Sequence, residues 1–203
     1  MVIVVKEKEA EDALEHVGFN VVQRMLVTSL GELETAAQKL SYPLVLKNVS
    51  LLHKSDGDAV KTNVTEETLL TSFKELRSKN VLVQKQISGV EFLLGIKKDP
   101  VFGHVAVCGL GGIFTEVFKD VSFRAIPLTK DDAHSMLSSL RASSIFDARG
   151  GKVNKGELVK SILLLNKLVE TFPHLLELDI NPLIINRDCA TVADARMVFE
   201  DKK

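Results

Sequence analysis

Three oxygen-bearing side chains recur at every second position near the C-terminus: Glu177, Asp179 and Asn181, in the segment Glu-Leu-Asp-Ile-Asn. Successive side chains of a strand point to opposite faces, so a strand here would carry all three on one face. If Asp194 comes alongside, Asn181 and Asp194 together with phosphate oxygens would suit Mg²⁺, which prefers hard oxygen ligands. The spacing therefore indicates a magnesium site, and a solvated edge strand is the alternative interpretation.

A lysine and a histidine loop form a second candidate group. Lys47 lies in the apolar run 43–47, which predicts a strand that carries its one charged residue outward. An ammonium group there is costly unless it pairs, and a nucleotide phosphate is one candidate partner. A lysine whose amino group reaches solvent is the alternative.

The polar loop His53-Lys54-Ser55-Asp56-Gly57 follows this strand directly. A neutral imidazole can attack phosphorus, and a nearby lysine stabilises the charge that develops. His53 and Lys54 are therefore candidates for phosphoryl transfer, although one histidine in a loop is usually only solvated. In Gly109-Leu110-Gly111-Gly112, backbone N–H groups could approach a phosphate, but the spacing matches neither the Walker nor the Rossmann pattern and favours a tight hairpin.

Periodicity predicts the elements that must position these residues. Apolar residues at helical spacing predict helices near residues 10–17, 33–40, 65–76, 133–140 and 156–172. Ser29 and Glu32 indicate a capping box for the second of these helices. Short β-rich runs predict strands at 43–47, 81–87, 90–96, 104–110, 113–118, 122–128, 177–181, 182–186 and 190–196. The turn 186–188 makes the last two a hairpin, so the class is α/β or α+β with a mixed sheet.

Composition limits the class of protein. The chain has 203 residues, 45% hydrophobic content and a net charge of -1, with both signs spread along it, so no field that gathers nucleic acid is expected. No apolar run is long enough to span a bilayer, and we expect no membrane partner. Two cysteines are too few for a disulfide framework or a zinc site. A cytoplasmic protein fits best.

Taken in order, the segments resemble the ATP-grasp part of the NDP-forming acyl-CoA synthetases, which include ADP-forming acetate-CoA ligase and succinyl-CoA synthetase. The matching segments are YPLVLKNVS, LLHKSD, VLVQKQI, GVEFLLGIKKDPVFG, GLGGIFTEVFKDVSFR, DARG, LELDINPLII and TVADAR. The resemblance implies an ATP-grasp domain over residues 1–203. It would form two small lobes of mostly antiparallel sheets flanked by helices, one of about residues 1–82 plus C-terminal parts and one of residues 83–203.

The resemblance also implies roles for single residues. Lys47 would hold nucleotide phosphate, Glu91 would meet the ribose, and Asp179 would lie beside the magnesium ligands Asn181 and Asp194. Adenine would be contacted through the backbone of Val83, Gln84, Lys85, Gln86 and Ile87. His53 would take phosphate from a phosphohistidine on a partner subunit and deliver it to ADP. Further phosphate contacts would come from Lys54, Gly111, Gly112 and Arg149.

The implied function is that of the beta subunit of an ADP-forming acyl-CoA ligase. It would act on ADP and ATP with Mg²⁺ and only with an alpha subunit that carries the CoA-binding and ligase domains, as an α2β2 assembly. One departure concerns the segment after His53, where the family usually has Val-Gly-Gly-Val-Lys and this chain has Gly57-Asp58-Ala59-Val60-Lys61. The loop before His53 is also about two residues shorter, so the alternative is a non-catalytic nucleotide-binding or assembly subunit.

Overall fold

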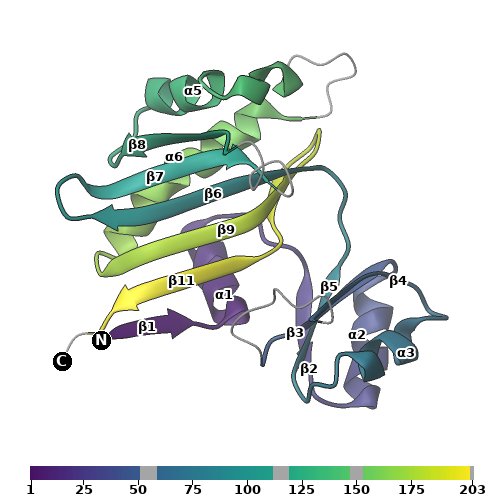
Figure 1. The fold of residues 1–203 in the computed structure, drawn as a ribbon. Coiled ribbons are helices and arrows are strands. Elements are labelled where there is room, and N and C mark those ends of the chain that lie inside the picture. Colours follow the sequence, from purple (N-terminus) through teal and green to yellow (C-terminus); the bar gives the residue numbers. More distant parts are fainter. Residues whose placement is uncertain (51–58, 112–118, 147–152, 202–203) are drawn as a thin grey trace. The chain divides into compact units, whose positions relative to one another are not determined.

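The computed structural model describes residues 1–50, 59–111, 119–146 and 153–201 (Figure 1). The chain forms two compact units, a larger one of Met1–Val21 and Ser88–Lys203 and a smaller one of Val22–Ile87. The lobe boundary expected near residue 82 lies close to Ile87, where the smaller unit ends. Residues 1–21 belong to the larger unit, although the sequence had placed them with residues 22–82.

The smaller unit is an antiparallel sheet covered by two helices. Its strands are β2 (Arg24–Val27), β3 (Leu44–Asn48), β4 (Val60–Val64) and β5 (Val81–Lys85), in the order β2-β5-β3-β4, and its helices are α2 (Leu30–Leu40) and α3 (Leu69–Glu75). The apolar stripe of α2 is buried as its spacing predicts, at Leu33, Ala36, Ala37 and Leu40. Burial of one leucine contributes about 1.5–3 kcal/mol, so this stripe fixes α2 on the sheet.

The start of α2 differs in one detail from the expected capping box. Ser29 accepts a hydrogen bond from the backbone N–H of Glu32 at 3.3 Å, as predicted. The Glu32 carboxylate accepts from the backbone N–H of Thr28 at 2.7 Å and from the Thr28 hydroxyl at 2.9 Å. The Glu32 carboxylate therefore binds Thr28, one residue before the N-cap residue Ser29 that a capping box requires. These hydrogen bonds hold the pKa of Glu32 below its usual value.

The larger unit is a sheet with the strand order β1-β11-β9-β6-β7-β8, and β10 pairs with β9. The strands are β1 (Val2–Val5), β6 (Val90–Asp99), β7 (Gly103–Leu110), β8 (Val121–Ala125), β9 (Leu175–Ile185), β10 (Ala190–Val192) and β11 (Ala195–Glu200). The helices are α1 (Glu7–Val17), α5 (Lys130–Ser138), the 3-10 helix η1 (Arg141–Phe146) and α6 (Lys155–Thr171). Leu94, Ile180 and Met197 on neighbouring strands share one core with the apolar faces of α1, α5 and α6. The helices therefore cover one face of this sheet.

A bulge interrupts β9 in the middle of the sheet. Ile180 pairs with Leu94 and Leu183 with Phe92, so Asn181 and Pro182 together lie opposite one residue of β6. The extra residue reverses the alternation of faces, and both Ile180 and Leu183 are fully buried despite their odd spacing. The two C-terminal strands expected at 177–181 and 182–186 are therefore one strand with a bulge between them.

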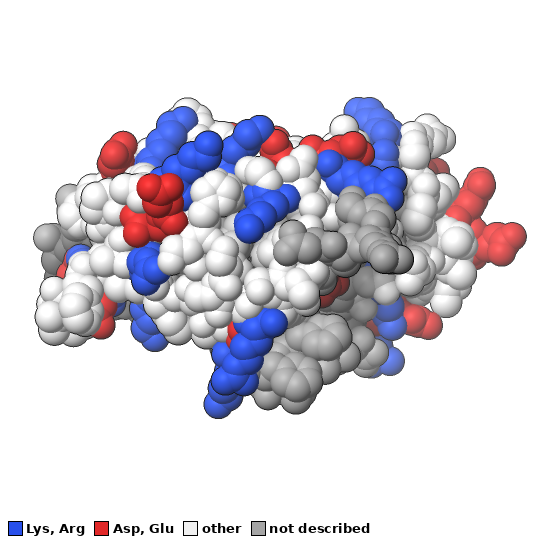
Figure 2. Space-filling view, turned by 90° about the horizontal axis from the view of Figure 1, so that it is seen from above, with Lys and Arg blue, Asp and Glu red and all other residues white. Residues whose placement is uncertain are grey.

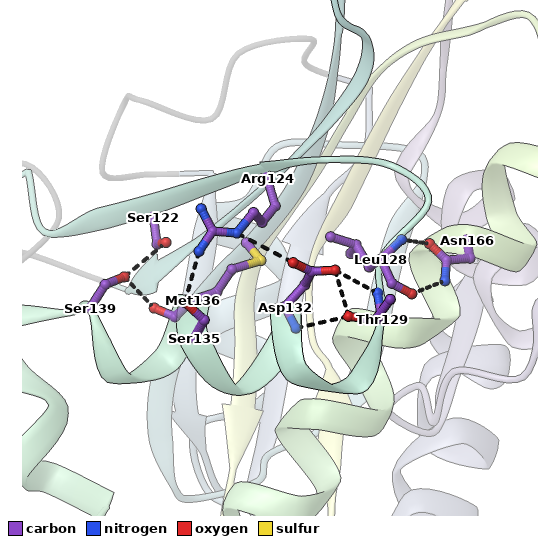
Figure 3. Close-up of polar contacts among 9 residues, drawn as sticks. All are labelled: Ser122, Arg124, Leu128, Thr129, Asp132, Ser135, Met136, Ser139 and Asn166. Atoms are coloured by element: carbon purple, nitrogen blue, oxygen red, sulfur yellow. Dashed lines mark hydrogen bonds and ion pairs between the residues drawn. The ribbon is translucent and has the colours of Figure 1, made fainter.

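The edge strand β8 is fastened to α5 by a polar network (Figure 3). Thr129 and Asp132 form a capping box at the start of α5. Arg124 on β8 donates to the Ser135 hydroxyl at 2.7 Å and lies 3.7 Å from the Asp132 carboxylate. A second link joins the β8 residue Ser122 to Ser139 at 3.0 Å. These contacts hold the helix over the strand.

Several other expectations can be compared with the structure. The hairpin around residues 186–188 is present, with Ile185 paired to Ala190, whereas β1 was not expected. The strand expected at 113–118 lies wholly outside the described residues. Cys108 and Cys189 are free. None of the described helices has the length and apolar character needed to cross a membrane, and acidic and basic side chains are interspersed on the face shown in Figure 2.

Candidate functional site

The carboxylates of β9 lie on the sheet face opposite the helices. Glu177 and Asp179 alternate with the buried residues Leu178 and Ile180, which face the core. Asp179 lies between Gly95 of β6 and Arg196 of β11. This face therefore carries acidic side chains next to Gly95, which has no side chain.

Asn181 and Asp194 come together at the bulge. The backbone N–H of Asn181 donates to the Asp194 carbonyl oxygen at 3.2 Å, and Ile180 pairs with Ala195 in the adjoining register. Asn181 is exposed and Asp194 is half-buried. Their side-chain oxygens are hard donors of the kind that Mg²⁺ takes. Among the described residues no group of three or more His, Cys, Asp or Glu could hold a metal.

The electrostatics around Asp179 favour a cation. Burial raises the pKa of Asp179, the nearby Glu177 and Asp194 raise it further, and Arg196 opposes them. Arg196 lies 3.6 Å from the Glu177 carboxylate. A positive charge near these groups relieves their mutual repulsion, as Arg196 does in part.

Glu91, near the start of β6, and Gly111, directly after β7, are joined through their backbones. Glu91 is exposed on β6, and its side chain lies on the same face of the strand as Gly95. The backbone N–H of Gly111 donates to the Glu91 carbonyl oxygen at 2.7 Å. A Cβ on Gly111 would lie 2.9 Å from that carbonyl carbon, so only glycine permits this close backbone approach. The backbone N–H of Gly111 is already hydrogen-bonded to Glu91.

Lys47 lies in the interior of the smaller unit's sheet. It is on β3 between Val60 of β4 and Leu82 of β5, on the face opposite the helices. Only 6% of its surface is exposed, so it does not extend into solvent as a snorkelling lysine would. Lys47 therefore has the burial that makes pairing with an anion favourable.

The segment expected to contact adenine is mostly engaged in the sheet. β5 pairs with β2 on one side and β3 on the other through Val83 and Gln84, and Gln84 is 2% exposed. The backbone N–H of Lys85 donates to Gln23 at 3.0 Å and that of Gln86 to Pro43 at 3.0 Å. The backbone N–H of Gln86 is thus already hydrogen-bonded within the unit. Ile87 is the last residue of the unit.

Four residues predicted from the sequence lie outside the described residues: His53, Lys54, Gly112 and Arg149. Two residues of the site were not singled out from the sequence. Arg196 comes two residues after Asp194, so in a strand the two side chains share a face, and this spacing was visible in the sequence. Gly95 could not be recognised, because its importance comes from the Leu178 carbonyl oxygen 2.6 Å from where a Cβ would stand.

Comparison with known proteins identifies the family. A family model described as an ATP-grasp domain matches residues 3–199. The chain belongs to the ATP-grasp family. This ATP-grasp domain is 34% identical over 214 residues to subunit beta of ADP-forming acetate-CoA ligase II of Pyrococcus furiosus, covering 96% of this chain and 91% of that subunit.

A longer relative and two solved structures are also similar to this chain. The domain is 36% identical to ADP-forming acetate-CoA ligase I of Archaeoglobus fulgidus, which it matches over 96% of its own length but only 31% of the ligase. Acetyl-coenzyme A synthetase 1 of Ca. Korarchaeum cryptofilum, in complex with coenzyme A and Ca-AMPCP, superposes with a TM-score of 0.91 at 30% identity, covering 97% of this chain and 93% of that chain. A second structure of that synthetase contains Mg-AMPPCP, with a phosphohistidine segment pointing towards the nucleotide-binding site (TM-score 0.85, 32% identity, 97% and 93% coverage).

Proposed function

We propose that the chain is the nucleotide-binding beta subunit of an ADP-forming acyl-CoA ligase in the cytoplasm, converting acyl-CoA, ADP and phosphate into acid, CoA and ATP. The observation that carries this proposal is the match to 91% of the Pyrococcus furiosus beta subunit. The chain spans about a third of the length of acetate-CoA ligase I from Archaeoglobus fulgidus. The CoA-binding and ligase domains are therefore assigned to an alpha subunit, in an α2β2 assembly.

The metal-binding role is assigned to Asn181 and Asp194. The backbone hydrogen bond from Asn181 to Asp194, which directly precedes β11, and the raised pKa of Asp179 support the assignment. When bound there with the nucleotide phosphates, Mg²⁺ would neutralise charge on the phosphoryl group during transfer. Asp179 stays beside the two ligands, and Lys47 would hold nucleotide phosphate with its ammonium group.

Further nucleotide-binding roles are assigned to Glu91 and to the end of β5. Glu91 would bind the ribose, and the end of β5 would bind adenine. Since Gln86 uses its backbone N–H within the smaller unit, we assign adenine contact to the Gln86 carbonyl and the backbone of Ile87. The remaining phosphate contacts are assigned to Lys54, Gly112 and Arg149.

His53 is assigned as the phosphate carrier. Its neutral imidazole nitrogen attacks the phosphorus of a phosphohistidine on the alpha subunit, a P–N bond forms on His53, and the P–N bond to the partner breaks. A terminal oxygen of ADP then attacks the same phosphorus, the bond to His53 breaks, and ATP leaves. No oxidant or further reactant is needed.

A labelling experiment tests the carrier. Purified chain is mixed with Mg-ATP labelled on the γ-phosphate, quenched in alkali, where phosphohistidine survives, and mapped by peptide. We expect label on His53, none in His53→Ala, and unchanged labelling in the matched control Ser55→Ala. His53→Ala should still bind Mg-ADP, because Lys47, Asn181 and Asp194 are intact.

The same experiment separates the alternative. Binding of Mg-ADP by the wild type without label, both alone and with the alpha subunit, would indicate a non-catalytic nucleotide-binding subunit. Label that persists in His53→Ala would show that phosphate passes through another residue.

A further inference from the structure

A polar contact in the smaller unit ties Gln86, which directly follows β5, to Asn63 on β4. The backbone N–H of Asn63 donates to Gln86 Oε1 at 2.6 Å, and Gln86 Nε2 donates to Asn63 Oδ1 at 2.7 Å. A backbone N–H can only donate, so it fixes which end of the Gln86 side-chain amide faces it. The two hydrogen bonds therefore hold this side chain in one orientation.

An irregularity in β4 accompanies this contact. The β3–β4 register shifts between Leu44 and Leu46, where β4 has one extra residue, and Asn63 lies there with a φ of 54°. Asparagine is one of the few residues besides glycine that adopt this left-handed conformation readily. Bulges next to binding sites often re-aim a side chain. Here Asn63 contacts the end of β5 even though β3 lies between the two strands in the sheet.

The main chain of Gln86 makes one hydrogen bond of a possible two with β3. Its N–H donates to the Pro43 carbonyl oxygen at 3.0 Å. Residues paired in this way in antiparallel strands exchange two hydrogen bonds, and the second would run from the partner's N–H to the Gln86 carbonyl oxygen. Proline has no N–H, so Pro43 cannot supply this bond. The pairing therefore leaves the Gln86 carbonyl oxygen able to accept a hydrogen bond from another group.

An acceptor at this place can distinguish two kinds of purine. The amino group on C6 of adenine is a donor, whereas the oxygen on C6 of guanine or hypoxanthine is an acceptor. A base with that oxygen would set two acceptors against each other and leave the carbonyl unpaired, which is costly. Hydrogen bonds also weaken steeply when their angle is poor. Selectivity for adenine therefore depends on how firmly the peptide group of Gln86 is held.

We propose that Asn63 is a positioning residue for base recognition, because it holds Gln86 so that the Gln86 carbonyl oxygen accepts from the 6-amino group of adenine. The inference rests on the proposed function, which assigns adenine to this carbonyl, and adds a residue that acts through Gln86. All of these contacts lie within the smaller unit. The alternative is a contact that only stabilises the edge of the sheet, and base selectivity separates the two.

Calorimetric titration of the purified chain with Mg-ADP and with Mg-IDP, whose base carries oxygen on C6, tests the inference. The wild type should bind ADP at least about tenfold more tightly than IDP. Asn63→Gly tolerates the positive φ and keeps the backbone N–H but removes the Oδ1 acceptor, whereas Gln86→Leu removes both side-chain hydrogen bonds. The preference for ADP should fall in Asn63→Gly and nearly vanish in Gln86→Leu, chiefly through weaker binding of ADP.

Two further variants serve as controls. Asn63→Asp keeps an oxygen in the place of Oδ1 and should retain the wild-type preference. Thr62→Ala changes the neighbouring exposed residue of β4 and should also behave as the wild type does. Thermal denaturation checks that every variant is folded, and if Asn63→Gly does not fold, Gln86→Leu decides the question.

The outcomes separate this inference from the proposed function. ADP and IDP weakened equally in Asn63→Gly and Gln86→Leu would mean that the contact only stabilises the fold. A preference unchanged in Gln86→Leu, lost equally in Thr62→Ala, or absent from the wild type would mean that the contact does not govern base recognition. Each of these results overturns the inference while nucleotide binding stands. A wild type that binds neither nucleotide overturns the proposed function as well.

Discussion

The two sheets place charges of opposite sign on the faces away from their helices. On the larger sheet Glu177 and Asp179 lie near Asp194, and their repulsion helps to raise the pKa of Asp179. On the smaller sheet Lys47 is almost fully buried. The comparison teaches that the candidate residues of the two units differ in chemistry, since carboxylates suit a cation and a buried ammonium group suits an anion.

The largest effects should come from the cores, which test whether the units differ in stability as they do in charge. Leu46→Ala in the smaller unit and Leu94→Ala in the larger unit each remove a fully buried side chain and should cost about 2–5 kcal/mol of unfolding free energy. Hydrogen exchange should show the loss of protection chiefly in the unit that carries the substitution. Equal loss in both units for both variants would mean that they unfold as one.

Next in size is the metal edge of the larger sheet. Asp194→Ala removes a hard oxygen ligand and should weaken Mg-ADP binding by at least about a hundred-fold. Calorimetry with Mg²⁺ and with EDTA is the measurement, and the loss should be far smaller in EDTA. Asp188→Ala, at an exposed turn carboxylate, is the control and should bind as the wild type does. Similar losses with and without metal would remove Asp194 from the metal site.

A smaller effect is expected on the basic sheet. Lys47→Ala should weaken ADP binding roughly tenfold, as expected for loss of a hydrogen bond to a charged group. Its effect should persist in EDTA, in contrast to that of Asp194→Ala. The apo variant should remain folded, because the apolar core of the smaller unit, which includes Leu44 and Leu46, is unchanged. If thermal denaturation shows the apo variant unfolded, Lys47 has a structural rather than a phosphate-binding role.

The smallest effect concerns α5, which carries no candidate site residue. Thr129→Ala removes the N-cap of α5 and should cost about 1 kcal/mol with no change in ADP binding. The hydroxyl and backbone N–H of Thr129 hold the pKa of Asp132 below its usual value. The stabilisation by Asp132 is therefore present above its ordinary pKa and is lost as pH falls through the lowered one. Asp132→Asn should accordingly lower the melting temperature at neutral pH and match the wild type in acid.

Local periodicity predicted most of the elements. The helices at 10–17, 33–40, 133–140 and 156–172 were visible because burial of one stripe leaves a repeat in the sequence. β1 was not predicted, since four apolar residues in a row show no alternation. The helix expected from Thr65 begins at Leu69, because the Thr68 hydroxyl accepts from the backbone N–H of Thr65 at 2.9 Å in a separate turn.

The arrangement of candidate site residues within one strand was predictable, whereas contacts between different strands were not. The shared face of Glu177 and Asp179 followed from the two-residue period. That Gln86 and Gly111 already use their amides could not be foreseen, because their acceptors, Pro43 and Glu91, lie elsewhere in the chain. The roles of His53 and Arg149 remain predictions, since both lie outside the described residues.

The bulge in β9 also limits how the length of this gene segment can change during evolution. Deleting one codon between Ile180 and Leu183 would restore strict alternation along the strand. If pairing before the bulge were kept, Leu183 and Ile185 would still face the core, because the bulge holds one extra residue, whereas deleting Ile184 would turn Ile185 out of the core. The fold should therefore tolerate single-residue changes in length at the bulge and in the turn at 186–188, where Arg187 and Asp188 are exposed, and not in the regular part of the strand.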